Sequence, residues 1–177
     1  MALKATICKV ELNIADMDRG YYADHVLTLA QHPSENDERL MLRLLAFVLY
    51  AHEDLAFSKG LSDPDEPDIW QKDLTGTIDL WIDLGQPDEK RVMKSCGRSR
   101  QVAVVAYGNA VPIWWAAIAP KLERANNLEV RRLVVQGDTP LAVFVQKNMK
   151  LQCTVQDGQL WLSDNERSIE IDAIPLR

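Results

Sequence analysis

The acidic residues between Ile78 and Gly85 are the first candidates for chemistry in this sequence. The segment reads Ile-Asp-Leu-Trp-Ile-Asp-Leu-Gly, so apolar side chains alternate with Asp79, Trp81 and Asp83. An alternation of period two is typical of a strand, and it places these three side chains on one face. Aspartate is disfavoured in so apolar a strand, and a buried carboxylate needs a partner. Asp79 and Asp83 are therefore candidate site residues.

A second carboxylate can reach Asp83 from the preceding segment. The segments 69–73 and 77–84 are typical of two strands joined by a turn. A hairpin of this kind places Asp68 opposite Asp83, with about 5 Å between their Cβ atoms. Asp79 is the rival partner. It lies roughly 13 Å from Asp83 along a regular strand at about 3.3 Å per residue, so it needs a bulge to come close. Both pairings stay open from the sequence.

Carboxylate oxygens at this spacing are the ligands that Mg²⁺ and Mn²⁺ prefer. The candidate metal ligands are Asp68, Asp79 and Asp83. A metal ion that polarises a phosphoryl oxygen, together with a lysine that stabilises charge, is what phosphodiester hydrolysis needs. Without a cation such carboxylates repel one another, so Asp83→Asn is expected to stabilise the metal-free protein slightly.

The cations for such a site are expected on a helix from Pro87 to Gly97. Lys90 and Lys94 are four residues apart and share one face of it. Every charged residue between positions 90 and 100 is positive, in a chain whose formal net charge is −6. Together they form a basic patch of Lys90, Arg91, Lys94, Arg98 and Arg100. Because an acidic chain repels nucleic acid at long range, this basic patch is the surface expected to meet a phosphate backbone.

A third carboxylate is available on an earlier helix. The sequence predicts a helix over residues 35–51, beginning at a capping box of Ser34 and Asp37. It is apolar almost all round after its first turn, which predicts that it is buried. Glu38 is expected to point inward, because it lies on the stripe formed by Leu42, Leu45 and Leu49.

These acidic and basic residues can also be explained without a metal or catalytic site. Asp79 and Asp83 would then lie on a solvated sheet face, and Glu38 would be an ordinary first-turn acid. The lysines would only complement the carboxyl end of their helix. Glu35 is expected to pair with Arg39.

The rest of the sequence predicts a single mixed α/β domain over residues 1–177. Its length suits one domain, and 47% hydrophobic with 26% charged residues is an ordinary globular composition. The remaining strands are expected at 3–14, 22–30, 101–107, 128–135, 151–156, 159–163 and 169–174, and the remaining helices at 113–125 and 140–147.

Several classes of site find no support. The sequence has no Walker loop, GxGxxG, HExxH or GxSxG motif. Cys8, Cys96 and Cys153 stand far apart without a CxxC pair, which argues against a disulfide framework or a zinc site. The N-terminus lacks the apolar centre of a signal peptide, and no apolar run reaches the roughly 20 residues of a membrane helix. We therefore expect a cytoplasmic monomer without membrane contact.

Five motifs carry a resemblance to known proteins: His32-Pro33-Ser34-Glu35, Glu38-Arg39, Glu66-Pro67-Asp68, Ile78 to Gly85, and Pro87-Asp88-Glu89. In these motifs the sequence resembles the YaeQ family of bacterial proteins. The resemblance covers nearly the whole chain and implies a compact variation on the PD-(D/E)XK nuclease fold, a mixed β-sheet flanked by helices with added β-hairpins. It brings no established activity.

The resemblance assigns roles to individual residues. Pro67-Asp68 matches the "PD" of the nuclease motif, with Asp79 as the rival first acid. Asp83 matches the "(D/E)", but Gly85 stands where that motif has its lysine. Lys94 or Lys90 would have to reach back from the next helix to replace it. Glu38 matches the acid on the first helix of many such nucleases, so the implied catalytic set is Glu38, Asp68, Asp79, Asp83 and Lys94.

Two functions follow as hypotheses. The first is a nuclease or related phosphodiesterase that acts on DNA or RNA with Mg²⁺ or Mn²⁺. The second is a non-catalytic binding protein that retains the nuclease shape. It would hold nucleic acid or a protein through the basic patch or through the segment 113–115. Because neighbouring helical residues diverge by about 100°, one indole of Trp114 and Trp115 is expected in the core and the other at least partly exposed.

Overall fold

The protein is built on one mixed sheet of ten strands. The computed structural model describes residues 4–59 and 63–177. The strands are β1 (Thr6–Asp16), β2 (Tyr21–Gln31), β3 (Leu55–Phe57), β4 (Ile69–Lys72), β5 (Ile78–Leu84), β6 (Ser99–Tyr107), β7 (Leu128–Val135), β8 (Asn148–Gln156), β9 (Gln159–Ser163) and β10 (Ser168–Pro175). The α-helices are α1 (Asp37–Leu49), α2 (Glu89–Arg98) and α3 (Val111–Ile118), with 3₁₀ turns η2 (Ala119–Leu122) and η3 (Leu141–Phe144).

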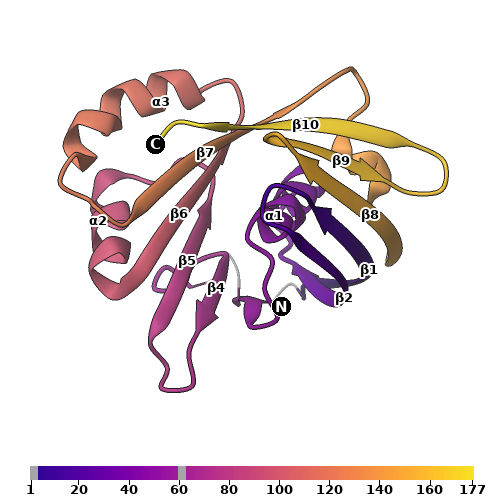
Figure 1. Ribbon diagram of the computed structural model, residues 1–177, viewed down its shortest axis with the longest axis horizontal. Coiled ribbons are helices and arrows are strands. Elements are labelled where there is room, and N and C mark those ends of the chain that lie inside the picture. Colours follow the sequence, from indigo (N-terminus) through magenta and orange to yellow (C-terminus); the bar gives the residue numbers. More distant parts are fainter. Residues whose placement is uncertain (1–3, 60–62) are drawn as a thin grey trace.

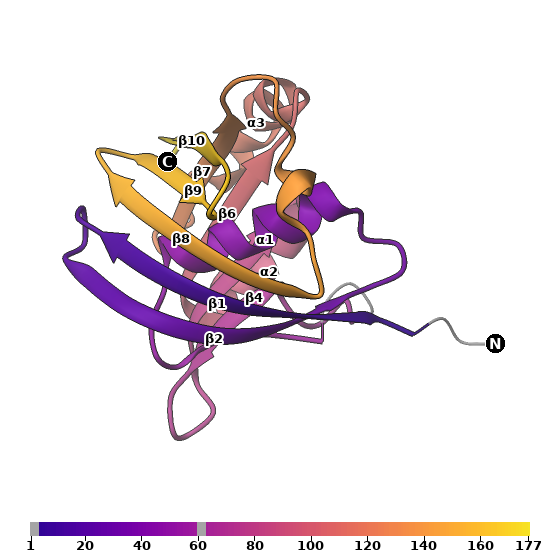
Figure 2. The same ribbon diagram turned by 90° about the vertical axis from the view of Figure 1, so that its right-hand side faces the viewer.

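The order of the strands is β2-β1-β8-β9-β10-β7-β6-β5-β4-β3. β1 pairs antiparallel with β2 and parallel with β8, while β5, β6 and β7 run parallel to one another. The sheet curves strongly, so that α1 lies in the hollow between its two halves, whereas α2 and α3 cover the outer face of β5, β6 and β7 (Figures 1 and 2). The result is the compact domain with a mixed sheet and flanking helices that the sequence predicts.

The core around α1 follows from the sequence pattern. Residues 40–49 of this helix are buried on every side, as its nearly continuous apolar run predicts. β1 presents its alternate residues to α1, and these are Cys8, Val10, Leu12 and Ile14. A second cluster fills the space between the sheet and the outer helices, and it includes Trp81, Val104, Ile118 and Leu122.

The parallel strands β5, β6 and β7 all end along one edge of the sheet. α2 and α3 are the crossovers from β5 to β6 and from β6 to β7. The carboxyl ends of these strands, at Leu84, Tyr107 and Val135, therefore lie along the same edge of the sheet. In open α/β sheets, ligands bind outside the carboxyl ends of the strands.

Several predicted boundaries are wrong. α1 begins at Asp37, because the Asn36 side chain caps it by accepting the Arg39 N–H at 2.8 Å, while the Ser34 hydroxyl bonds to His32 instead. α2 continues past Gly97 to Arg98.

The two later helices are shorter than predicted. α3 ends at Ile118 and continues only as a 3₁₀ turn, since Pro120 lacks the N–H that an α-helix interior needs. The helix predicted at 140–147 is a single 3₁₀ turn, η3. The short strand β3 was not predicted, and Leu3, the start of the first predicted strand, lies outside the described residues. No helix in the described ranges is long and apolar enough to cross a membrane.

Candidate functional site

Asp68 and Asp83 line one pocket at the carboxyl end of β5. Ile69 pairs with Ile82 in the antiparallel register of β4 and β5, and the Asp68 N–H donates to the Ile82 carbonyl at 3.1 Å. The predicted hairpin is thus confirmed, while the predicted pairing of the Asp68 and Asp83 carboxylates stays a prediction, because the register ends at Ile69 and Ile82. Asp68 is 8% and Asp83 3% exposed, so both carboxylates are buried. They line a pocket of about 380 Å³ together with Arg39, Glu66, Gln86 and Arg91.

Asp83 is held by an arginine on α2. Arg91 Nε donates to Oδ2 of Asp83 at 2.8 Å and Nη2 donates to Oδ1 at 2.9 Å, which is a bidentate ion pair. The same guanidinium donates to the carbonyls of Pro64 and Glu66 at 2.8 and 2.9 Å. Hydrogen bonding to Asp83 raises the pKa of Arg91 above its ordinary value. Arg91 therefore joins β5, α2 and the loop before β4 through one charged group.

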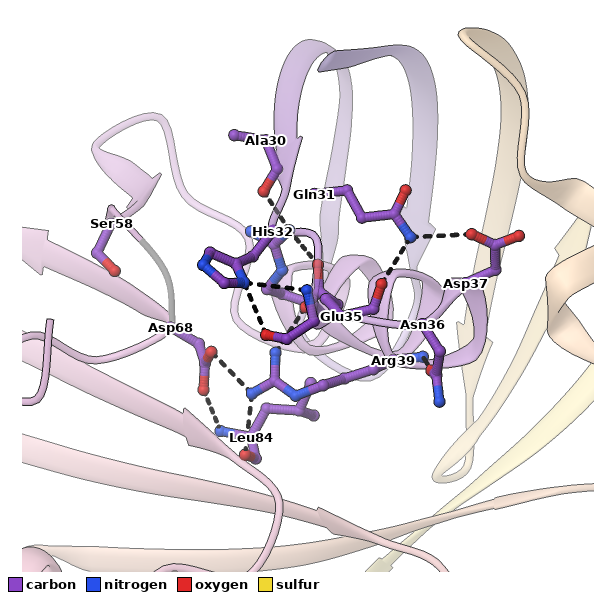
Figure 3. Close-up of polar contacts among 12 residues, drawn as sticks. Ala30, Gln31, His32, Glu35, Asn36, Asp37, Arg39, Ser58, Asp68 and Leu84 are labelled. Carbon is purple, nitrogen blue, oxygen red and sulfur yellow. Dashed lines mark hydrogen bonds and ion pairs between the residues drawn. The ribbon is translucent and has the colours of Figure 1, made fainter. Parts of the chain in front are cut away.

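Asp68 is held from two sides. Its Oδ2 accepts the Leu84 N–H at 2.8 Å, and its Oδ1 accepts Nη2 of Arg39 at 3.0 Å. Figure 3 shows the Arg39 side chain reaching from α1 toward both Asp68 and Leu84. Burial lowers the pKa of Arg39, but the carboxylates of Asp68 and Glu35 outweigh it, and the pKa lies above its ordinary value.

Arg39 is part of a buried network of ion pairs that includes Glu35 and Arg43. Arg39 Nη1 donates to Glu35 at 2.6 Å, which confirms the predicted Glu35–Arg39 pair. Glu35 also accepts Nη2 of Arg43 at 2.8 Å, and the same Arg43 atom donates to the Ala30 carbonyl at 3.0 Å. The network thus links β2, α1 and the start of β4, and it fixes the position of the Asp68 carboxylate.

The donor set of this pocket suits a hard divalent cation. Two carboxylates face one pocket, and oxygen ligands are those that Mg²⁺ and Mn²⁺ take. Each carboxylate oxygen already accepts a hydrogen bond, from Arg91, Arg39 or the Leu84 N–H. A cation between Asp68 and Asp83 would therefore compete with Arg91 for the oxygens of Asp83. Within residues 4–59 and 63–177, no cluster of three or more His, Cys, Asp or Glu side chains is arranged as a metal site.

Asp79 lies away from this pocket. A register shift between Gln71 and Lys72 interrupts the pairing of β4 and β5 beside it. Its carboxylate lies 3.0 Å from Nη1 of Arg100, at the other end of β5. The structure therefore brings Asp68, and not Asp79, to Asp83.

Neither candidate lysine reaches Asp83. Lys94 Nζ lies 3.1 Å from Oδ1 of Asp65, and both side chains are exposed. Lys90 is also exposed. Gly85, at the place of the motif lysine, has a φ of 114°, a conformation in which any residue with a Cβ is strained. The cation beside Asp83 is Arg91, which sequence reasoning grouped with the basic patch without assigning it to the site.

Glu38 lies in a different pocket. It lines a cavity of about 280 Å³ at the carboxyl ends of β6 and β7, together with Leu42, Tyr107 and Leu133. The apolar stripe predicted the direction of its side chain correctly, since Leu42 lines the same cavity. Because α1 packs on the face of β5 opposite to Asp83, the structure does not place Glu38 with Asp68 and Asp83 in one pocket.

The basic patch is largely neutralised by acids. Arg91 pairs with Asp83 and Lys94 with Asp65, while Arg100 lies 3.0 Å from Asp79. Arg98 packs over the Trp81 ring, 5.3 Å from its centroid, and donates to the Asp65 carbonyl at 3.2 Å. The positive charges of this segment thus hold the preceding acidic loop and β5 in place.

The two neighbouring tryptophans of α3 are both partly exposed. Trp114 donates its indole N–H to the Pro87 carbonyl at 2.9 Å, and its ring lies 5.8 Å from that of Trp115. The prediction that one indole is in the core is wrong, because both indoles are only partly buried where they pack against the second cluster.

Known proteins resemble this chain over nearly its full length. The family model described as "YaeQ protein" matches residues 1–173. The "Uncharacterized protein YaeQ" of Escherichia coli (strain K12) is 46% identical over 173 residues, which cover 97% of this chain and 96% of the relative. That of Salmonella typhi is 48% identical over 172 residues, covering 97% of this chain and 95% of the relative.

Two crystal structures agree with this assignment. YaeQ from Xanthomonas axonopodis pv. citri has a TM-score of 0.93 at 49% identity, with 98% of both chains covered. YaeQ from Pseudomonas syringae has a TM-score of 0.88 at 32% identity, covering 98% of this chain and 96% of the other. This chain belongs to the YaeQ family.

Proposed function

We propose that the chain is a metal-dependent phosphodiesterase of the nuclease type, acting on DNA or RNA with Mg²⁺ or Mn²⁺. The observation that carries the proposal is that Asp68 and Asp83 line one pocket. Both carboxylates are buried, and the pocket lies at the carboxyl end of a parallel strand. Such an arrangement costs stability unless it serves a ligand or a fixed partner, and it is where an α/β sheet binds ligands.

The architecture supports a core of the PD-(D/E)XK kind. Pro67-Asp68 stands immediately before β4, and Asp83 lies near the end of β5. The sheet is mixed and carries helices on both faces, as the family resemblance implies. The β1–β2 hairpin and the β8–β9–β10 meander would be additions to that core.

In the proposed phosphodiester hydrolysis, each residue of the pocket would have a separate role. Asp68 and Asp83 would hold the metal ion, which when bound polarises a phosphoryl oxygen and activates water. Arg91 would take the place of the missing lysine, because its guanidinium is always protonated and can neutralise charge that develops on the phosphate. Arg39 would keep the Asp68 carboxylate in position. Arg91 cannot act as an acid or a base at neutral pH, so its role in this proposal is electrostatic.

A second candidate is a non-catalytic binding protein with the same fold. It is favoured by the saturation of both carboxylates, whose four oxygens all accept hydrogen bonds within the protein. In this case the ion pairs would only fix the loop before β4 on the sheet. The pocket would then have no use for a metal ion.

The unfolding temperature with and without Mn²⁺ separates the two candidates. A cation that binds only the folded protein raises this temperature. The proposal expects a rise with the wild type, no rise with Asp83→Asn, and a full rise with Asp79→Asn, a matched substitution in the same strand outside the pocket. Labelled single- and double-stranded DNA and RNA then test cleavage. A wild type without a Mn²⁺-dependent rise and without cleavage would exclude the nuclease and leave the binding protein.

A further inference from the structure

The strand β2 is a long, free edge of the sheet. It stands at one end of the strand order, beside β1 alone, and runs for 11 residues in an unbroken register with that strand (Figure 2). Proteins usually protect such an edge with a short strand, a lysine, a proline or a bulge. β2 contains no lysine, proline or bulge. The strand at the opposite end of the order, β3, has only 3 residues.

The backbone of every second residue in β2 points away from the sheet. On the other side of β1, the N–H groups of Lys9 and Met17 donate to the carbonyls of Lys147 and Val155, both at 2.8 Å. Because backbone groups alternate in direction along a strand, the even-numbered residues of β1 bond to β2. Their partners in β2 are the odd-numbered residues. The even-numbered residues of β2 therefore turn their N–H and C=O groups to the free side.

Most of these outward groups are available to a partner. The Ala30 carbonyl accepts Nη2 of Arg43 at 3.0 Å, which agrees with its outward direction and closes one end of the edge. Within the described ranges, no hydrogen bond within the protein uses the outward backbone groups of Tyr22, Asp24, Val26 and Thr28. The side chains of these four residues are exposed as well. Four of the seven exposed large hydrophobic side chains of the described chain lie in the β1–β2 hairpin: Ile7, Met17, Tyr22 and Val26.

We propose that a second copy of this chain pairs with β2, antiparallel, about a two-fold axis at His25. Tyr22 then lies opposite the partner's Thr28, and Asp24 opposite the partner's Val26. Each of these pairs exchanges two hydrogen bonds, so the register uses all four free residues of both copies. An axis at Asp24 would place two aspartates directly opposite each other, and an axis at Val26 would need the Ala30 carbonyl that Arg43 occupies. The edge is thus complementary to itself in one register.

The side chains agree with this register. On the exposed face, Tyr22 meets the partner's Thr28, an aromatic and β-branched pair of the kind that stabilises sheets, and no like charges lie directly opposite. On the inner face, His25 meets the partner's His25. Burial lowers the pKa of His25, so the two rings are uncharged at neutral pH. Pairing through four residues on each side is a small interface, which predicts a weak dimer with a Kd in the micromolar range or above.

Two measurements on the intact protein test the dimer. Sedimentation velocity over a concentration series from micromolar to millimolar should show a shift from monomer to dimer. Amide hydrogen exchange followed by NMR should locate the interface. The N–H groups of Tyr22, Asp24, Val26 and Thr28 should exchange fast in dilute protein and slowly in concentrated protein. The N–H groups of the odd-numbered residues, which bond to β1, should exchange slowly in both.

Substitutions of Val26 separate the edge from the rest of the strand. Val26→Pro removes an outward N–H and leaves the bonds to β1 intact, as prolines in natural edge strands do. It should weaken dimerisation at least about tenfold, because the two-fold axis doubles the loss. Val26→Thr keeps the N–H and the branched shape and should dimerise like the wild type. Val26→Asp, which places like charges opposite the partner's Asp24, should also weaken the dimer. Thermal melts of dilute protein should show which of the variants are folded.

The outcomes decide the proposal without reference to any nuclease activity. A dimer that protects the four edge amides, and that Val26→Pro or Val26→Asp weakens while Val26→Thr does not, supports it. A protein that stays monomeric over the whole concentration series, as expected from the sequence, overturns it. A dimer that leaves the edge amides unprotected also overturns it. So does a dimer that folded Val26→Pro and Val26→Asp form as tightly as the wild type.

Discussion

Arg91 donates to both oxygens of Asp83, from Nε at 2.8 Å and from Nη2 at 2.9 Å. A metal ion bound to Asp83 would need the same oxygens. The Asp83 side chain is 4% exposed and that of Arg91 33%. The guanidinium is therefore the part of the pair that can move toward solvent. The charge of Asp83 is neutralised in the metal-free protein, and a metal ion would compete with an internal cation.

Replacing Arg91 tests this competition. Arg91→Gln leaves Asp83 buried with weaker partners and should lower the free energy of unfolding by about 2 kcal/mol, less than for a fully buried pair because Arg91 is partly exposed. It also frees the oxygens of Asp83, so Mn²⁺ should raise the unfolding temperature of this variant more than that of the wild type. Urea unfolding and thermal melts measure both quantities. An equal or smaller Mn²⁺ effect in Arg91→Gln would show that Arg91 does not compete with the metal.

The ion pair also reverses one expectation for Asp83. From two carboxylates alone, Asp83→Asn was expected to stabilise the metal-free protein by removing a repulsion. Because Asp83 is paired with Arg91, the substitution removes an attraction and leaves Arg91 with a neutral partner. We therefore expect Asp83→Asn to be destabilised by about 1–2 kcal/mol in urea unfolding without metal ions. An increase in stability would mean that repulsion from Asp68 outweighs the ion pair.

A lysine at position 85, where the nuclease motif has one, should destabilise the protein instead of completing the motif. Gly85 has a φ of 114°, so Gly85→Lys should lower the free energy of unfolding by about 1–3 kcal/mol through backbone strain. Gly85→Ala carries the same strain without the charge and is the matched control. Equal losses in the two variants are expected in urea unfolding. A lysine variant as stable as the wild type would show that this position tolerates a side chain.

The buried thiol of Cys153 predicts a dependence of stability on pH. Burial, with the nearby Asp16 carboxylate, raises the pKa of Cys153 to about 12, from an ordinary value of 9.0. The unfolded chain therefore loses this proton at lower pH than the folded protein does. Between pH 9 and 12 the unfolded state binds fewer protons, so the free energy of unfolding should fall as pH rises.

Two measurements check this behaviour. Urea unfolding between pH 8 and about 10.5 should show a smaller loss of stability for Cys153→Ala than for the wild type, because one titrating group is absent. Iodoacetamide at pH 9 should leave Cys153 unmodified in the native protein and should modify it in urea. Rapid alkylation of Cys153 under native conditions would contradict the assigned burial.

The sequence predicts those parts of the fold that depend on local pattern. Most strands could be placed because apolar residues alternate between turn residues, and the hairpin of β4 and β5 could be predicted from the turn residues at 74–76. The burial of α1 could be predicted from its continuous apolar run. The 3₁₀ turn at 141–144 could not be predicted, because its apolar residues are equally compatible with an α-helix and a 3₁₀ helix.

The rest of the candidate site depends on contacts between distant segments. Arg91 reaches Asp83 only because α2 packs on that face of β5, and nothing in the spacing of the two residues requires it. The separation of Asp79 from Asp83 is that of a regular strand, but its contact with Arg100 depends on the packing of β6 beside β5. Glu38 faces inward as its stripe predicts, but only the placement of α1 on the opposite face of the sheet shows which pocket it lines.

The parallel pairing of β1 with β8 has a consequence for biosynthesis. Lys9 of β1 pairs with Asn148 of β8, so the hairpin at the N-terminus waits for the last third of the chain before its inner edge is covered. On the ribosome, that edge stays open while β3 to β7 emerge, and closing such a long loop is slow. An open edge invites pairing with other nascent chains. We therefore expect this protein to fold after release, and truncations before residue 148 to aggregate during expression.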